Sequence, residues 1–253
     1  MKPSKTFDLI TYLRFRMIIQ LIVSLTFVMG TSLFACANEQ EYKMINPTTE
    51  GIGKIYMGRH ISRFMSHLGA NWLERPERFY QERPNILINS LLIKPNYIIA
   101  DIGAGTGYFS FKLSKLVPQG KVYAVDIQEK MLGIINKKIT NQGVKNIQTV
   151  LGTITDPKLP ENKIDIAILV DAYHEFSHPK EMCNSIFKSM KIKGKLVMVE
   201  YRAEDDNIPI KQLHKMTNSQ IIKEISSCGF SWEKTDSKSL PWQHIVVFIK
   251  KNN

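Results

Sequence analysis

Short apolar runs alternate with amphipathic segments along most of this 253-residue chain. Runs rich in Ile, Val, Leu and Ala and bounded by turn residues are typical of buried strands. The segments between them repeat apolar residues every three to four positions, as helices do. The predicted strands span residues 97–102, 121–127, 147–151, 164–170, 195–200, 230–237 and 244–250. The predicted helices span residues 84–92, 108–116, 129–141, 179–190 and 219–227.

This alternation predicts an α/β fold, a doubly wound and mostly parallel sheet of seven strands with helices on both faces. The last two strands lie close together around Pro241, and the last is expected to run antiparallel. Residues 84–253 would form this domain, and residues 38–83 a linker and a partly helical N-terminal extension that folds over the ligand site. In open α/β sheets, ligands bind at the carboxyl ends of the strands, where the strand order reverses.

Residues 1–37 differ in composition from the rest of the chain. Four basic residues precede Met17, whereas residues 17–37 carry no charged side chain and end in Ala35-Cys36-Ala37. That order is typical of a bacterial secretory signal, and the uncharged run is also long enough to span a bilayer. The pattern therefore predicts a signal peptide or a retained membrane anchor. Residues 33–36 also resemble a lipoprotein box, with lipidation at Cys36 as a third alternative.

The position of the basic residues bears on where the rest of the chain resides. Because they flank the N-terminal side of the apolar run, a signal peptide and an anchor both place the domain outside the cytoplasm. In a Gram-negative bacterium that location is the periplasm. An anchor would contact or span the membrane. A translation start at Met44 or Met57 would instead leave a cytoplasmic protein, and this alternative stays open.

The net charge of +11 is carried mostly by bases scattered along the chain without interleaved aromatic residues. This pattern favours a generally basic surface, so a nucleic-acid partner is not expected. Three cysteines do not make a disulfide framework. No group of His, Cys or acidic residues has the spacing of metal ligands, so the sequence predicts no metal site.

The predicted strand at 97–102 runs directly into Asp101-Ile102-Gly103-Ala104-Gly105-Thr106-Gly107 and then into a predicted helix. Glycines between a strand and a helix N-terminus let the backbone approach a ligand closely. A dinucleotide fingerprint has G-x-G-x-x-G spacing, whereas Tyr108 stands here at the third glycine position. A carboxylate at Asp101 would repel a pyrophosphate and attract an ammonium group. The loop therefore favours a ligand with an amino-acid part.

The loop resembles motif I of the class I S-adenosylmethionine-dependent methyltransferases, and the resemblance extends over about 200 residues. It implies that S-adenosylmethionine is the cofactor and that the loop binds it through Asp101, Gly103, Ala104, Gly105 and Gly107. Asp126, which ends the next predicted strand, would accept the ribose hydroxyls, with Ile127 beside it; capping of the following helix is the alternative role for Asp126. The resemblance also places Thr153 and Ile154 at the adenine and Asp171 near the amino-acid end of the cofactor.

The segment after the fourth strand is where the methyl group of such a cofactor would point. His174 is the candidate general base, because its unperturbed pKa is near 6.5, and Tyr173 is a weaker candidate. The alternative role for His174 is to order the loop by hydrogen bonding. Methyl transfer from a sulfonium requires alignment of donor and acceptor, and no metal.

A small-molecule methyl acceptor is favoured, because the chain has neither an N-P-P-[YF] motif nor a Pro-Cys nucleophile. Several residues outside the family motifs are expected to line the acceptor pocket: Trp72, Arg75, Arg78, Glu200, Tyr201, Arg202, Lys211, His214, Lys215 and Met216. The identity of the acceptor and the oligomeric state are not encoded in any motif. The alternative function is that of an exported, non-catalytic ligand-binding protein on the same fold.

Overall fold

The seven predicted strands are all present in the computed structural model, which describes residues 42–252. The predicted signal peptide or anchor at residues 1–37 lies outside the described residues. Residues Met44–Asn253 form one compact unit. Its main sheet contains β4 (Ile98–Ile102), β5 (Lys121–Asp126), β6 (Ile147–Leu151), β7 (Ile164–Val170), β8 (Met190–Arg202), β10 (Ser231–Asp236) and β11 (Gln243–Ile249).

The strand order in this sheet is β10-β11-β8-β7-β4-β5-β6. Strands β4 to β8 pair in parallel, whereas β11 runs antiparallel to both β8 and β10. The prediction of a mostly parallel sheet with an antiparallel last strand is confirmed. The sheet has eight strands instead of seven, because β9 (Lys215–Met216) pairs with β8. Two residues are too few to produce a hydrophobic pattern.

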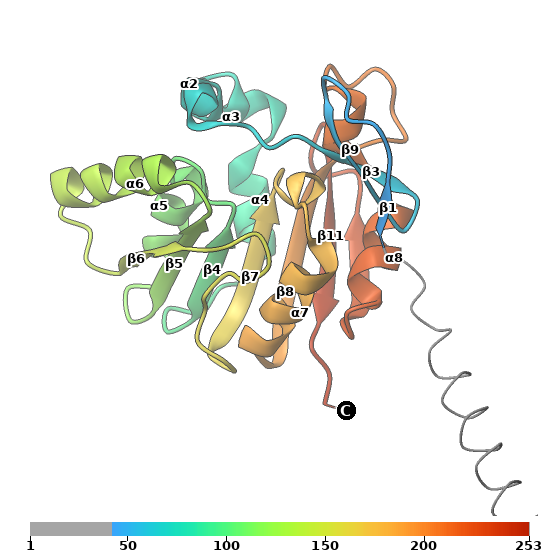
Figure 1. The fold of residues 1–253 in the computed structure, drawn as a ribbon. Helices are drawn as coiled ribbons and strands as arrows, with labels where there is room; N and C mark the ends of the chain where they lie inside the picture. Colours follow the sequence, from blue (N-terminus) through green and yellow to red (C-terminus); the bar gives the residue numbers. More distant parts are fainter. Residues whose placement is uncertain (1–41, 253) are drawn as a thin grey trace, which may run out of the picture. The chain divides into compact units, whose positions relative to one another are not determined.

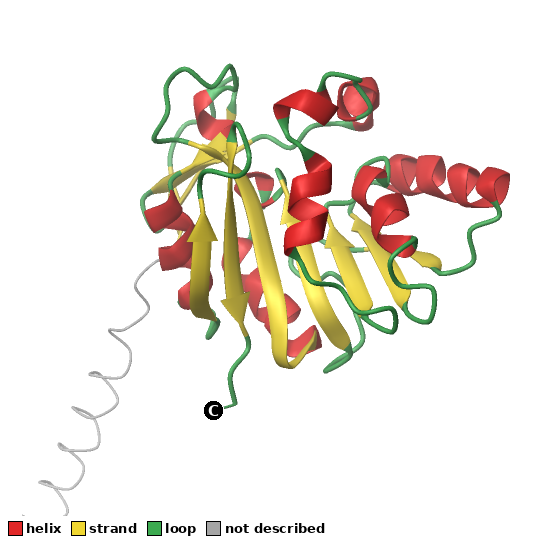
Figure 2. Ribbon diagram, turned by 180° about the vertical axis from the view of Figure 1, so that it is seen from behind, coloured by secondary structure: helices red, strands yellow, loops and turns green. Residues whose placement is uncertain are grey.

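Helices cover both faces of the sheet (Figures 1 and 2). The helices α4 (Pro84–Ser90), α5 (Tyr108–Ser114) and α6 (Glu129–Gln142) pack on one face. The other face is covered by α7 (Pro179–Ser189) and α8 (Asn218–Ser226). Because side chains alternate along a strand, Ile99 of β4 belongs to the first core and Ala100 to the second.

The N-terminal extension begins with β1 (Tyr42–Met44) and the antiparallel hairpin of β2 (Gly51–Tyr56) and β3 (Arg59–Ser62). The short helices η1 (His67–Gly69), α2 (Ala70–Leu73) and α3 (Arg78–Gln81) follow. The expected partly helical character is confirmed, whereas the hairpin was not predicted. Its turn requires Gly58 at a φ of +98°.

A buried ion pair fastens the hairpin to the sheet domain. The Arg59 guanidinium donates through Nε and Nη2 to the two carboxylate oxygens of Glu224 in α8, at 2.7 and 2.8 Å. Further along, the extension carries α2 and α3 over the carboxyl ends of the parallel strands (Figure 1). The extension therefore covers the edge of the sheet where ligands bind in this class of fold.

Two further short helices lie at that edge: η2 (Tyr173–Glu175), after β7, and η3 (Gln212–His214), before β9. Across residues 42–252, no helix combines the length and the hydropathy that a membrane span requires.

Candidate active site

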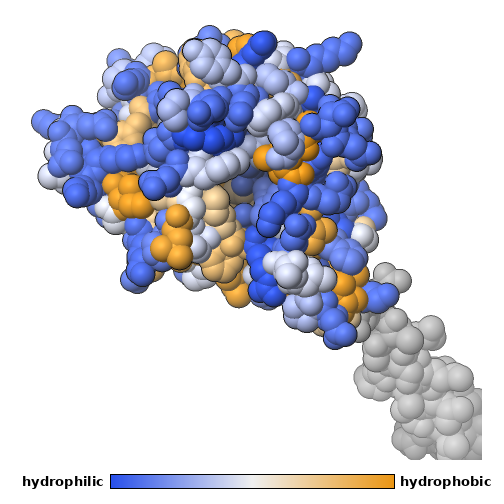
Figure 3. All heavy atoms as spheres, turned by 90° about the horizontal axis from the view of Figure 1, so that it is seen from above, coloured by the Kyte–Doolittle hydropathy of each residue, from blue (hydrophilic) through white to orange (hydrophobic). Residues whose placement is uncertain are grey.

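A cavity of about 760 Å³ lies at the carboxyl ends of the parallel strands, beside the point between β4 and β7 where the strand order reverses. The loops after β4, β5, β6 and β7 line it from the sheet side, and Trp72 and Leu73 of α2 line it from the extension. Figure 3, which views this end of the molecule, shows hydrophilic residues with scattered hydrophobic ones between them. The cavity itself is lined by carboxylates such as Asp126 and Asp171 and by apolar side chains such as Leu73 and Ile154, which suits a ligand with both polar and apolar parts.

The glycine loop lines the cavity through Gly103 and Gly105, whose φ angles are +77° and +55°. A Cβ atom on Gly103 would lie 2.6 Å from the Cβ of Ala172, and one on Gly105 would lie 2.7 Å from Cδ1 of Leu73. The Gly103 N–H donates to the carbonyl oxygen of Val125 at 2.9 Å. Glycine is therefore required here by both the backbone angle and the lack of space.

Asp126 ends β5 and lines the cavity. Its Oδ2 accepts a hydrogen bond from the Gly105 N–H at 2.9 Å, and its Oδ1 accepts one from the Gln128 N–H at 2.8 Å. Burial raises the pKa of this carboxyl, against the effect of the backbone donors. Both predicted roles are compatible with this geometry, because each oxygen can accept a second hydrogen bond while it orders the start of α6.

Three of the predicted cofactor residues do not line the cavity. Asp101 is buried on the α5 face of β4, where its Oδ2 accepts a hydrogen bond from the Ser110 hydroxyl at 2.5 Å. Burial raises the pKa of Asp101 to about 6. Ala104 packs in the core, and Gly107 is the N-cap of α5. Asp101 therefore lies beneath α5 and not on the cavity, and its contact with the ammonium of the ligand stays a prediction.

Asp171 is the carboxylate that does line the cavity after β7. Its backbone has a φ of +50°, which is unusual for a residue with a Cβ. Its Oδ2 accepts a hydrogen bond from Gln243 Nε2 at 2.8 Å, whereas its buried Oδ1 has no partner among the described residues. Burial raises the pKa of Asp171 well above its usual range, and the charges of Glu82 and Glu200 act in the same direction.

The residues predicted to border an adenine also line the cavity. Thr153 and Ile154 follow β6, and Ile127 follows β5. The side chains of Ile127 and Ile154 remain 42% and 49% exposed, so they present apolar surface without a protein partner. An aromatic ring placed between these loops would bury that surface.

The expected acceptor residues share a buried carboxylate that the sequence analysis did not single out. Glu82 accepts hydrogen bonds from Arg75 Nη2 at 2.7 Å, Arg78 Nε at 2.5 Å and the Tyr201 hydroxyl at 3.0 Å. The Arg75 guanidinium also lies 3.7 Å from the centroid of the Trp72 ring. These contacts join α2 and α3 to β8, and they place Trp72, Arg78 and Tyr201 along the cavity.

His174 lies on the same cavity and is held by a second buried carboxylate. Its Nδ1 is 2.6 Å from Oε2 of Glu200, which is fully buried and also accepts the Tyr173 N–H at 2.9 Å. Its Nε2 is 3.1 Å from Nδ1 of His214 in η3. Glu175 also lines the cavity, and its Oε1 accepts the Met65 N–H at 3.0 Å.

Burial and neighbouring charges shift the pKa values of His174, Glu175 and His214. Burial opposes the charge on His174, but the charge and hydrogen bond of Glu200 outweigh it and raise the pKa of that imidazole. Burial and the neighbouring His174 lower the pKa of His214 to about 4. Burial raises the pKa of Glu175 to about 7. Glu200 thus favours the protonated form of His174, whereas burial favours the neutral form of His214.

Tyr173, the second catalytic candidate, does not line the cavity. Its ring is 1% exposed and packs in the core beneath α7 and α8, with the Arg59 guanidinium 5.4 Å from the ring centroid. Tyr173 and His174 are consecutive residues of η2, and a helix of three residues per turn directs successive side chains to different sides, so His174 faces the cavity and Tyr173 does not.

A family model described as "Methyltransferase domain" matches residues 93–245, which include the glycine loop, Asp126 and the His174 segment. The chain belongs to this methyltransferase family. The family is of the class I, S-adenosylmethionine-dependent type, and its members are enzymes.

Relatives of this methyltransferase support the same assignment. It is 34% identical to the ubiquinone/menaquinone biosynthesis C-methyltransferase UbiE of Wigglesworthia glossinidia brevipalpis over 119 residues. These residues make up 46% of this chain and 48% of the relative. It is 22% identical over 157 residues to the uncharacterized methyltransferase YcgJ of Bacillus subtilis, 60% of this chain and 61% of that relative. The chain thus spans about half the length of the UbiE relatives it matches.

The methyltransferase fold is also found in solved structures. A SAM-dependent methyltransferase from Aquifex aeolicus superimposes with a TM-score of 0.70 at 21% identity, over 74% of this chain and all of that one. A type 11 methyltransferase from Sulfolobus solfataricus gives a TM-score of 0.58 at 20% identity, over 68% of this chain and 95% of that one. At these identities the likeness concerns the fold.

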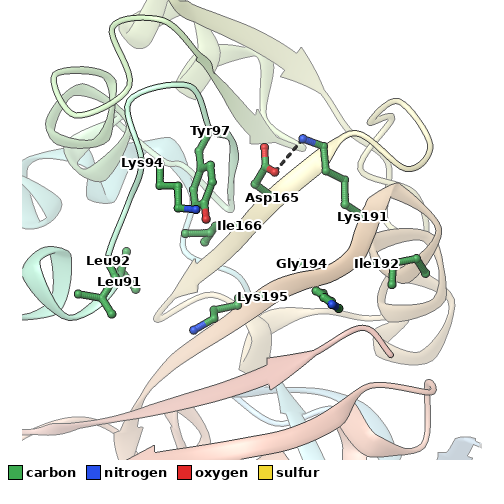
Figure 4. Close-up of a pocket in the computed structure, with 11 residues that line it drawn as sticks. Leu91, Leu92, Lys94, Tyr97, Asp165, Ile166, Lys191, Ile192, Gly194 and Lys195 are labelled. Atoms are coloured by element: carbon green, nitrogen blue, oxygen red, sulfur yellow. Dashed lines mark hydrogen bonds and ion pairs between the residues drawn. The ribbon is translucent and has the colours of Figure 1, made fainter. Parts of the chain in front are cut away.

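A smaller hollow of about 380 Å³ lies at the opposite edge of the sheet of this methyltransferase (Figure 4). Tyr97 and Lys191 line it, and Lys191 Nζ donates to Asp165 Oδ1 at 2.7 Å. None of the predicted site residues lies there. The predicted site residues that line a cavity, such as Asp126, Asp171 and His174, therefore line the larger one at the carboxyl ends of the strands.

Proposed function

We propose that this methyltransferase moves the methyl group of S-adenosylmethionine to a small-molecule acceptor bound in the 760 Å³ cavity. The observation that carries the proposal is that one cavity is lined together by the glycine loop, Asp126, Asp171 and His174. Cofactor-binding groups and a proton-accepting cluster thus lie in a single hollow, as transfer between two bound molecules requires.

The cavity residues fit the cofactor in three respects. Gly103 and Gly105 line the cavity, so the backbone of the loop is exposed to a ligand there. Asp126 has acceptor capacity left for ribose hydroxyls. Asp171 has an unpartnered carboxylate oxygen in the described structure, which suits the ammonium of the amino-acid end. Thr153, Ile154 and Ile127 are then the residues we assign to the adenine.

When bound, the cofactor supplies a sulfonium whose methyl carbon accepts an electron pair from the acceptor while the carbon–sulfur pair stays on sulfur. The chain has to align the acceptor with that carbon and to remove the proton that the acceptor loses. We assign the proton to the His174–His214 pair, in which Glu200 orients His174. The extension excludes water by covering the cavity with α2.

The small-molecule acceptor is supported by the way Glu82 ties the extension to β8, which encloses the acceptor side of the cavity. The UbiE relatives are named for quinone biosynthesis, and a ring-bearing acceptor fits beside Trp72 and Tyr201. For the location, we keep the exported or membrane-anchored form as the proposal. N-terminal sequencing of the native protein tests it, since a first residue near 38 indicates cleavage and Met44 or Met57 indicates a downstream start.

Isothermal titration calorimetry of the full chain with S-adenosylhomocysteine tests the cofactor site. We expect saturable binding and a loss of about 10-fold or more for Asp126→Ala, because a hydrogen bond to a charged group contributes about 1.5–3 kcal/mol. Glu161→Ala, which removes an exposed acid at the opposite edge of the sheet, is the control and should leave affinity unchanged. Folded protein that binds neither S-adenosylmethionine nor its demethylated product would refute the proposal.

The acceptor is sought by comparing metabolite extracts before and after incubation with the protein and S-adenosylmethionine. We expect one or more small molecules to gain the mass of a methylene group, and methyl-labelled cofactor to label the same species. Label that appears only in protein or nucleic acid would overturn the small-molecule assignment.

A further inference from the structure

Three potential metal ligands meet at the acceptor side of the cavity: His174 and Glu175 of η2, and His214 of η3. Nε2 of His174 lies 3.1 Å from Nδ1 of His214. Oε1 of Glu175 lies 3.9 Å from the first nitrogen and 3.7 Å from the second. We propose that these three side chains bind one divalent transition-metal ion of the borderline type, such as Zn²⁺, Fe²⁺ or Co²⁺.

The spacing of the two imidazoles matches that of two ligands on one ion. Histidine nitrogens bind such ions at about 2.0–2.1 Å, so two of them lie about 2.9–3.4 Å apart when their bonds make right to tetrahedral angles. The two nitrogens already have this separation at 3.1 Å. The carboxylate has to approach by roughly half an ångström, which a rotation of the glutamate side chain supplies.

The surroundings of His174 have the arrangement that metal-ligating histidines show. Such a histidine donates its other ring N–H to a carboxylate or carbonyl, which fixes the tautomer and the direction of the ligating nitrogen. Nδ1 of His174 has this contact with Glu200 at 2.6 Å, and the other oxygen of Glu200 is held by the Tyr173 N–H. Glu200 is thus a positioning residue, and it leaves Nε2 of His174 on the side of His214, 3.1 Å from Nδ1 of that residue.

The donor set indicates which ions fit. Two imidazoles and one carboxylate suit Zn²⁺, Fe²⁺ and Co²⁺, whereas Mg²⁺ and Ca²⁺ prefer oxygen ligands. Three protein ligands leave further coordination positions open, and all three residues line the cavity. An ion here would replace the proton shared by the imidazoles. It would also hold an oxygen of the acceptor and lower its pKa.

The metal site rests on the proposed function only for its role toward the acceptor, because the ligand geometry stands without the cofactor. Without a metal ion, the two imidazoles and Glu200 have only the proton-accepting role that the proposed function gives them. A cluster with that role alone should show no saturable metal binding, so direct binding measurements separate the two cases.

The test uses the full chain, stripped of metal with a chelator, and follows Zn²⁺ binding by calorimetry and Co²⁺ binding by visible absorption. We expect one ion per chain and an intense Co²⁺ spectrum of low coordination number. His214→Ala should bind at least 10-fold more weakly, and Glu200→Gln about 10- to 100-fold more weakly, because loss of the carboxylate that orients a ligating histidine weakens metal binding by that amount. His60→Ala, which removes an exposed histidine of β3, should behave as the wild type.

His214 is partly exposed, so His214→Ala should fold even where Glu200→Gln does not, and circular dichroism checks this. Wild-type protein that binds neither ion saturably, or His214→Ala that binds as tightly as wild type, would overturn the metal site. S-adenosylhomocysteine binding is measured on the same samples. Cofactor binding without metal binding refutes the metal site alone, and metal binding without cofactor binding refutes the proposed function alone.

Discussion

The two halves of the cavity are built in different ways. The cofactor half consists of loops that directly follow β4, β5 and β6, and its main contacts involve the backbone of Gly103 and Gly105. The acceptor half is assembled from α2, α3, η2, β8 and η3, which lie far apart in the sequence. Buried carboxylates join these segments, with Glu82 holding Arg75, Arg78 and Tyr201, and Glu200 holding His174.

The difference shows which parts of a site tolerate change. A backbone loop on parallel strands depends on the sheet for its shape, and a methyl group added at Gly103 or Gly105 would collide with Ala172 or Leu73. The acceptor half depends on a few buried charges, each of which satisfies several donors. Removal of one carboxylate there leaves cations buried without a partner, which is more costly than loss of the pair itself.

The largest effect is expected for Glu82→Ala in the acceptor half. Arg75 and Arg78 would lose their shared partner, so we expect the free energy of unfolding to fall by about 3–5 kcal/mol in urea denaturation. Asp156→Ala removes the exposed ion pair with Lys158 and should cost less than about 1 kcal/mol. Equal losses for both variants would show that the Glu82 contacts do not hold the acceptor half together.

A smaller loss of stability, but a selective loss of binding, is expected for Gly103→Ala in the cofactor half. The new Cβ would lie 2.6 Å from the Cβ of Ala172 at a φ of +77°, so S-adenosylhomocysteine affinity should fall by about 100-fold. Gly133→Ala is the matched control, because Gly133 lies in α6 with no neighbouring atom within 4 Å. It should keep affinity and raise helix stability by up to about 1 kcal/mol. Retained affinity in Gly103→Ala would contradict the close backbone approach.

The smallest effect is expected for Asp101, which lies beneath the cofactor half and makes the free energy of unfolding depend on pH. Burial raises its pKa to about 6, with Arg78 lowering it and Asp126 raising it. The folded form then holds the Asp101 proton more tightly than the unfolded form does. The protonated carboxyl therefore adds its full contribution to the free energy of unfolding below about pH 4, and this contribution is lost as the pH rises through about 6. Between pH 4 and 7 the free energy of unfolding should vary less in Asp101→Asn than in the wild type, by about 2 kcal/mol, as followed by thermal unfolding.

Asp206→Asn, which changes an exposed acid, serves as the control for Asp101 and should reproduce the wild-type pH curve. A pH curve that is the same for wild type and Asp101→Asn would mean that burial does not raise the pKa of this carboxyl.

Much of the fold could be predicted because buried parallel strands and amphipathic helices have strong periodicity. The predicted strands at 147–151 and 164–170 coincide with β6 and β7. The β2–β3 hairpin and β9 were missed, because short strands at the edge of the domain carry little hydrophobic pattern. Asp126 was found as a cavity residue from its place at a strand end, whereas the burial of Asp101 beneath α5 depends on which face of β4 it occupies.

The sequence by itself determined the α/β fold, the strand-to-helix glycine loop and the position of Asp126, because these depend on local periodicity and on backbone geometry. Only the tertiary structure decided the acceptor half. Glu82 is 119 residues from Tyr201, and His174 is 40 residues from His214, yet each pair is in contact. No spacing rule links residues so far apart, since it is the packing of the extension and of η3 on the sheet that brings their charges and imidazoles together.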